Sequence, residues 1–205
     1  MTAMQQARTC LGILGAMLLA GGLHAAPIQV TVDTSLLAGS TIDLAFDLTD
    51  GGPPDNTVTI TGFTTDGSLD AAAIVTQGQV TGTLPGTVQL ADTLGFSEYL
   101  QGIVLGSSLQ FIFDTTGKIA DPGSFPDAFA FFLLDAGLPI PTSDPTGANA
   151  LFLYNIGDAA PLQVYASDAV TVRAVDVTNG APEPGVAALA IAALLALGVV
   201  RKVRR

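Results

Sequence analysis

The stretch Thr41-Ile42-Asp43-Leu44-Ala45-Phe46-Asp47-Leu48 alternates large apolar side chains with polar or small ones. Successive side chains of a β-strand point to opposite faces of the sheet, so the large apolar side chains of this stretch share one face. They are Ile42, Leu44, Phe46 and Leu48. The stretch therefore predicts a strand that lays one face on a hydrophobic core and carries two aspartates on the other.

The same alternation recurs along the chain and is broken by Gly, Pro, Asn and Asp at intervals of about 8 to 12 residues. Thr, Val, Ile and Phe are frequent between the breaks, as is typical of strands. This spacing predicts an all-β fold, a single antiparallel β-sandwich of jelly-roll-like type. The further strands are expected at 28–33, 57–63, 72–76, 79–83, 87–90, 108–113, 129–134, 150–154, 162–165 and 169–177.

Three segments predict particular local features of the fold. Residues 50–56, Asp-Gly-Gly-Pro-Pro-Asp-Asn, predict a hairpin loop between two strands. Residues 97–103 predict one short helical turn. The run Phe-Ala-Phe-Phe-Leu-Leu at 129–134 is apolar throughout and predicts a central strand buried on both faces. An aromatic platform for a ligand is the alternative interpretation of that run.

The N-terminal segment has the three parts of a secretory signal peptide. Arg8 precedes an apolar run at 11–23, and small residues follow at Ala25 and Ala26. We expect a signal helix in residues 1–25 and cleavage by signal peptidase between Ala25 and Ala26. An uncleaved anchor is the alternative, but the run is shorter than the roughly 20 residues that span a bilayer.

The last residues combine three elements in a fixed order: Pro182-Glu183-Pro184, an uncharged apolar run at 185–200 and a basic tail at 201–205. A helix that is apolar on all sides favours a transmembrane helix over a buried C-terminal helix of the domain. The run would be about 24 Å long as a helix, and flanking basic side chains can extend such a span. Positive charge after it predicts that this end stays in the cytoplasm while the preceding domain is exported. The residues that would determine this topology are Arg201, Lys202, Arg204 and Arg205.

This arrangement resembles the PEP-CTERM sorting signal of Gram-negative bacteria, and the resemblance covers residues 182–205, with Val203 interrupting the basic tail. It implies that Pro182, Glu183 and Pro184 are recognised by an exosortase, a membrane transpeptidase that cuts near this motif. It also implies export across the inner membrane, a transient membrane anchor, and then a place at the cell surface or outside the cell, in a setting of exopolysaccharide and biofilm production. The middle of the chain resembles a PEP-CTERM group of unknown function at Asp135, 144–149 and Leu151-Phe152.

The intervening residues 26–181 form one domain-sized, strongly acidic segment. They hold 17 of the 18 acidic residues and 2 of the 7 basic ones, which gives a net charge of about −15. This charge repels phosphates and argues against nucleic acid as a partner. The only Cys and His, Cys10 and His24, belong to the expected signal peptide. Their positions exclude Ser-His-Asp and Cys-His catalysis and Cys/His zinc sites from the domain, so we expect no enzyme and no required cofactor.

Carboxylates are the candidate ligands that remain. Asp47, Asp50 and Asp55 surround the predicted hairpin loop, and calcium takes six to eight oxygens, often from aspartates in loops. Their spacing does not fit an EF-hand, so solvated turn carboxylates are the alternative. A carbohydrate-binding module or a carboxylate-based hydrolase also stays open, although the domain has no Trp to stack on a sugar.

The sequence therefore predicts a non-enzymatic, exported surface or extracellular-matrix protein that is sorted and processed through its C-terminal signal. Exosortase and signal peptidase would be its processing enzymes, and exopolysaccharide a candidate partner. A calcium- or carbohydrate-binding adhesin module is the alternative function.

Overall fold

The computed structural model describes residues 26–177. The expected signal peptide at 1–25, the sorting motif at 182–184, the apolar helix at 185–200 and the basic tail at 201–205 lie outside this range. Within residues 26–177, no helix is long and apolar enough to cross a membrane.

Antiparallel strands make up most of the described chain. They are β1 (Ile28–Asp33), β2 (Thr41–Thr49), β3 (Thr57–Thr65), β4 (Ser68–Gln77), β5 (Gln79–Gly82), β6 (Val88–Ala91), β7 (Phe96–Val104), β8 (Ser108–Thr115), β9 (Ala128–Asp135), β10 (Leu138–Pro139), β11 (Phe152–Asn155), β12 (Leu162–Val164) and β13 (Thr171–Asp176). One 3₁₀ turn, η1 (Ser35–Leu37), lies between β1 and β2.

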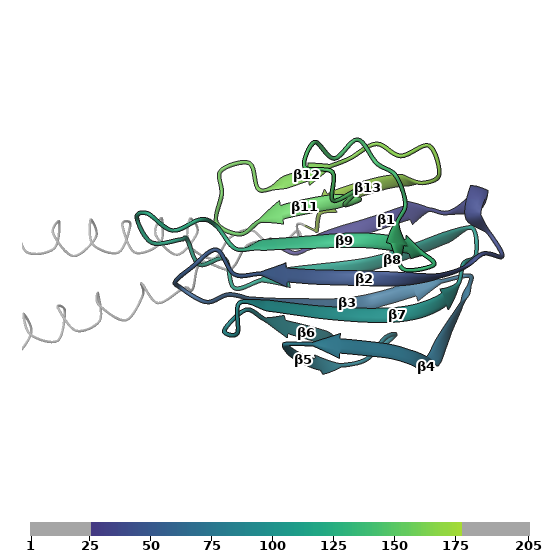
Figure 1. Cartoon of the computed structure of the whole chain (residues 1–205), viewed down its shortest axis with the longest axis horizontal. Helices are drawn as coiled ribbons and strands as arrows, with labels where there is room; N and C mark the ends of the chain where they lie inside the picture. The colour runs from purple at the N-terminus through teal and green to yellow at the C-terminus, as the bar shows by residue number, and fades with distance from the viewer. Residues whose placement is uncertain (1–25, 178–205) are drawn as a thin grey trace, which may run out of the picture.

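The strands form two sheets packed face to face (Figure 1). The six-stranded sheet has the order β13-β1-β8-β3-β6-β5, and the seven-stranded sheet has the order β12-β11-β9-β2-β7-β4 with β10 beside β9. Every connection from β1 to β9 changes sheet, except the one between β5 and β6. The prediction of an all-β antiparallel sandwich is confirmed.

The stretch at 41–48 lies in β2, between β7 and β9 in the seven-stranded sheet. Its four large apolar side chains are all buried, so the predicted core face is confirmed. Phe46 from this face meets Phe111 of the six-stranded sheet edge-on, with ring centroids 5.1 Å apart. Such aromatic pairs add about 0.5–1.5 kcal/mol beyond the area that they bury. The fully buried phenylalanines of the core are Phe46, Phe111, Phe113, Phe129, Phe131 and Phe152.

The apolar run at 129–134 forms most of β9, which is a central strand as predicted. Phe129 and Phe131 point into the core and pack against other rings there, which excludes them as an exposed ligand platform. Phe132 and Leu134 are only half-buried. The prediction that the run is buried on both faces is therefore wrong, because only one face of this sheet meets the other sheet.

Two local predictions are also wrong. Residues 97–103 are not a helical turn but lie in β7, a strand between β2 and β4. Residues 50–56 do not close a hairpin, because β2 and β3 belong to different sheets and the segment crosses from one to the other.

Candidate functional site

Three connections between the sheets meet at one end of the sandwich: 50–56, 92–95 and 116–127. The strand register explains why these connections lie together. Thr49 pairs with Ala128, so Asp50 and Asp127 come just beyond the same end of the β2–β9 ladder. Thr57 pairs with Ala91, so Asn56 and Asp92 come just beyond the β3–β6 ladder.

Asn56 is the centre of the hydrogen-bond network at this end. Its backbone N–H donates to both carboxylate oxygens of Asp92, at 2.8 Å and 3.0 Å. Its side-chain Nδ2 donates to Oδ2 of Asp127 at 2.7 Å and to the carbonyl of Lys118 at 3.1 Å. Its Oδ1 accepts from Oγ1 of Thr116 at 2.7 Å and from the Lys118 N–H at 2.9 Å. One amide side chain therefore ties two connections to each other.

The two aspartates on either side of Asn56 are withdrawn from solvent, Asp92 being 0% exposed and Asp127 2%. Burial raises the pKa of Asp92 to about 7, with further contributions from a hydrogen bond to Asp127 and from the charges of Asp127 and Asp50. Two buried carboxyls in contact cannot both ionise without a large energetic cost. Asp92 therefore keeps its proton to a higher pH than an exposed aspartate does.

The same carboxylates are the group best placed to hold a cation in the described part of the chain. Asp50, Asp92 and Asp127 each offer an oxygen, and these oxygens lie within 4.8 Å of one another. Several of them already accept backbone hydrogen bonds, from Gly51 to Asp127 at 2.8 Å and from Gly52 to Asp50 at 2.6 Å. A divalent cation bound here would have to displace the proton that Asp92 tends to hold.

Of the three aspartates predicted from the sequence as calcium ligands, only Asp50 belongs to this cluster. Asp55 is exposed, and its backbone carbonyl accepts from Nζ of Lys118 at 2.7 Å. Asp92 and Asp127 escaped sequence reasoning because 36 and 71 residues separate them from Asn56. Only the strand register brings them together, and no local motif marks either one.

Asp47 lies opposite Glu98 on the outer face of the seven-stranded sheet, away from the cluster. Burial, and then the charge of Glu98, raise the pKa of Asp47 to about 7, and burial also raises the pKa of Glu98. Oδ1 of Asp47 is buried and has no hydrogen-bond partner among the described residues. This pair therefore places two acidic side chains next to each other on a half-buried part of the sheet.

The segment that resembles the PEP-CTERM group of unknown function forms a self-contained turn. Oδ1 of Asp144 accepts from the backbone N–H of Thr146 at 2.9 Å, and its Oδ2 accepts from the N–H of Ala150 at 3.2 Å. Leu151 and Phe152, which follow, are fully buried. These contacts give the segment a structural role at the entry to β11.

The fold and the buried carboxylates define the class of this protein, an acidic antiparallel β-sandwich. Comparisons of the chain with protein families, with curated proteins and with solved structures found no match in any of the three.

Proposed function

We propose that the chain is a non-enzymatic exported protein, displayed at the cell surface or released into the extracellular matrix of a Gram-negative bacterium. The observation that carries the proposal is the order of elements at the C-terminus: Pro182-Glu183-Pro184, the apolar run 185–200 and the basic tail 201–205. The proposal is supported by the position of the motif along the chain, because β13, the last strand among residues 26–177, ends at Asp176 and the motif begins at Pro182. A protease or transpeptidase needs an accessible extended segment of this kind.

In this proposal each terminal element has its own task. Pro182 and Pro184 keep the motif extended, since proline fixes its backbone and disfavours a helix before it. An exosortase would act at this motif while the apolar run holds the substrate in the membrane. The acidic β-sandwich, which we also infer to be jelly-roll-like, would be the exported part. Support for that finer topology comes from the alternation of successive strands between the two sheets.

The test replaces the three motif residues Pro182, Glu183 and Pro184 with Ala in the native host. We expect the variant to fold normally and to stay in the inner membrane with its C-terminus intact. A matched control replaces the linker residues Thr178 and Asn179 with Ala and should be processed like the parent. Normal processing of the motif variant would contradict the proposal.

A second candidate function, a calcium-dependent adhesin module, is favoured by the grouping of Asp50, Asp92 and Asp127. Calcium at millimolar concentration should then raise the melting temperature of the parent and leave that of an Asp127→Asn variant unchanged. Equal melting curves of the parent with calcium and with a chelator would remove this candidate and leave the cluster as a structural network.

A further inference from the structure

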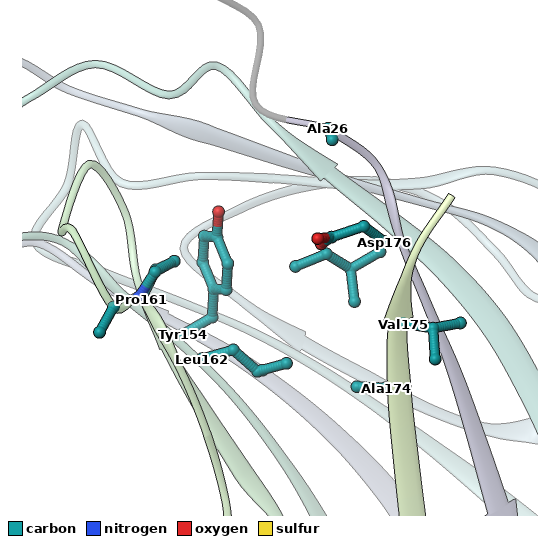
Figure 2. A pocket seen from close by; sticks show the side chains of 9 residues that line it. Ala26, Tyr154, Pro161, Leu162, Ala174, Val175 and Asp176 are labelled. Atoms are coloured by element: carbon teal, nitrogen blue, oxygen red, sulfur yellow. The ribbon is translucent and has the colours of Figure 1, made fainter. Parts of the chain in front are cut away.

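The open edge between β13 and β1 on one sheet and β11 and β12 on the other contains a cleft of about 500 Å³ (Figure 2). Most of its lining is apolar, from Ile28, Pro161, Leu162 and Ala174 among others. The side chain of Tyr154 and the carboxylate of Asp176 are the polar groups that lie within it. The cleft thus combines apolar walls with one hydroxyl and one negative charge.

The carboxylate of Asp176 is exposed and makes no ion pair among residues 26–177. Tyr154 is only 5% exposed, and its hydroxyl interacts with the side chain of Thr115. Burial, followed by the charges of Asp176 and Asp114, raises the pKa of Tyr154, so the phenol is neutral at physiological pH. The charges near the cleft, those of Asp176 and Asp114, are both negative. A group that pairs with the carboxylate of Asp176 should therefore be a cation.

The chain itself can supply a cation at Ala26, which lines the same cleft. β1 pairs with β13 so that Ile28 lies opposite Asp176, and residues in register share a face. Ala26, two residues earlier, falls on that face as the diagonal neighbour of Asp176. Diagonal neighbours have Cβ atoms roughly 7 Å apart, which an aspartate side chain can bridge. The Val177 N–H donates to the Pro27 carbonyl at 2.7 Å, so the two segments remain together beyond the strands.

We propose that this cleft is the binding site for the N-terminus created when the signal peptide is removed, with the new α-ammonium of Ala26 paired to the carboxylate of Asp176. The proposal rests on the proposed function, since it requires signal peptidase to cut before Ala26. Water cleaves the peptide bond between Ala25 and Ala26. Its oxygen goes to the carbonyl carbon of Ala25, and the released amine takes up a proton from solvent.

The α-ammonium can donate hydrogen bonds to the carboxylate of Asp176. Before cleavage, the same nitrogen is a neutral amide with a single hydrogen, so the ion pair exists only in the processed chain. It would fasten β1 to β13, the last strand before the sorting motif. Removal of the N-terminal signal would therefore stabilise the strand from which the C-terminal signal emerges.

The test is a two-by-two comparison in the processed chain, residues 26–205, held in detergent micelles. One protein begins at Ala26 after release from a cleavable fusion, and the other carries Gly-Ser before Ala26, which moves the charge away from the cleft. Each is made with Asp176 and with Asp176→Asn. An Asp168→Asn variant serves as the matched control, since Asp168 does not line this cleft.

We expect the Gly-Ser extension to lower the melting temperature by about 2 °C when Asp176 is present, and to have no effect in Asp176→Asn. In the unextended parent, the pKa of the α-amino group should lie about half a unit or more above that of the extended chain. That pKa is read from the pH dependence of amine labelling of the N-terminal peptide. This comparison uses only the two proteins that retain Asp176, so it does not require the Asp176→Asn variant to fold.

An extension that has the same effect in both backgrounds, or an α-amino pKa that is not raised, would overturn the proposal. A mature protein that begins at a residue other than Ala26 in the native host would overturn it as well. A mature protein that begins at Ala26 but retains Arg205 would contradict exosortase processing and leave the ion pair standing. The two proposals can therefore fail separately.

Discussion

The side chain of Asn56 makes several of the hydrogen bonds that hold the connections at this end of the sandwich. Its amide group makes hydrogen bonds to Asp127, Thr116 and Lys118 in a place where water does not reach. A buried donor or acceptor that loses its partner costs about 1–3 kcal/mol, and more when the partner is charged. The connections at this end of the sandwich depend on that amide.

The variant Asn56→Ala should therefore lower the free energy of unfolding by about 2–4 kcal/mol, measured by urea denaturation. Asn155→Ala is the matched control, because no hydrogen bond of the Asn155 side chain is present in the described structure. It should change stability by less than about 1 kcal/mol. Similar losses in the two variants would show that the network contributes nothing specific.

Asp92 gives the stability of the domain a pH dependence with a defined sign. Its pKa is raised to about 7, so the folded state holds the proton more tightly than the unfolded state does. Its contribution is fully present below about pH 4, where the unfolded group is also protonated, and is lost as pH rises through about 7. Asp47, with a pKa also near 7, adds to the same trend.

We expect Asp92→Asn, which mimics the protonated acid, to reduce the fall in stability between about pH 4 and pH 8, measured by urea denaturation at a series of pH values. Asp66→Asn is a control of opposite sign. Hydrogen bonds from Ser107 and Ser108 lower the pKa of Asp66 to about 2, so its contribution disappears only in strong acid. A pH profile of Asp92→Asn parallel to that of the parent would contradict the assignment.

At the scale of single elements, β2 and β7 explain why one strand could be predicted and its neighbour could not. In β2 every inward side chain is large and apolar, so the alternation is visible in the sequence. In β7 the inward side chains include Ser97, Tyr99 and Gln101, which are buried but polar. Polar residues can occupy a core only where partners exist, and no sequence pattern reveals partners that are distant in the chain.

The partners of these side chains lie in β7 itself, in the neighbouring strand β4 and in the connection between β5 and β6. The Tyr99 hydroxyl donates to Oε1 of Gln101 at 2.7 Å and accepts from the Leu84 N–H at 3.0 Å, while Nε2 of Gln101 donates to the Asp70 carbonyl. The prediction of a hairpin loop at 50–56 failed for a related reason. Gly and Pro indicate that the chain turns, but they do not indicate which sheet receives it.

Tyr99→Phe should lower the free energy of unfolding by about 1–3 kcal/mol, because it leaves the Leu84 N–H and the Gln101 amide without their partner. Hydrogen exchange at Leu84 should become faster, which separates this effect from a loss of packing. Tyr165→Phe is the matched control, since its hydroxyl makes only an exposed hydrogen bond to Gln163. Equal stability of Tyr99→Phe and the parent would show that the hydroxyl is dispensable.

At the scale of the whole molecule, the two sheets share one continuous core, and its buried cluster runs from Ile28 to Val170. β1 and β13 are neighbours, so the described chain begins and ends at the same edge of the sandwich (Figure 1). The fold class followed from alternation and turn spacing, which are local. The carboxylate cluster depends on register, and the cleft depends on which strands reach the edge, so neither could be predicted.

We propose that the apolar run at 185–200 is a membrane anchor and not a helix of the domain. A chain of residues 26–181 should therefore unfold at the same temperature as residues 26–205, to within about 1 °C. Calorimetry of the two chains in the same detergent checks this expectation. A loss of several degrees on truncation would mean that the apolar run at 185–200 packs on the domain as its C-terminal helix.

The central claim is that the chain is exported and processed at its C-terminus. The most direct test is the intact mass of the mature protein recovered from each cell fraction of its native host. We expect a protein that begins at Ala26, ends near Pro182–Pro184 and is found at the cell surface or in the medium. A mass that retains Arg205, from protein in the inner membrane, would contradict it.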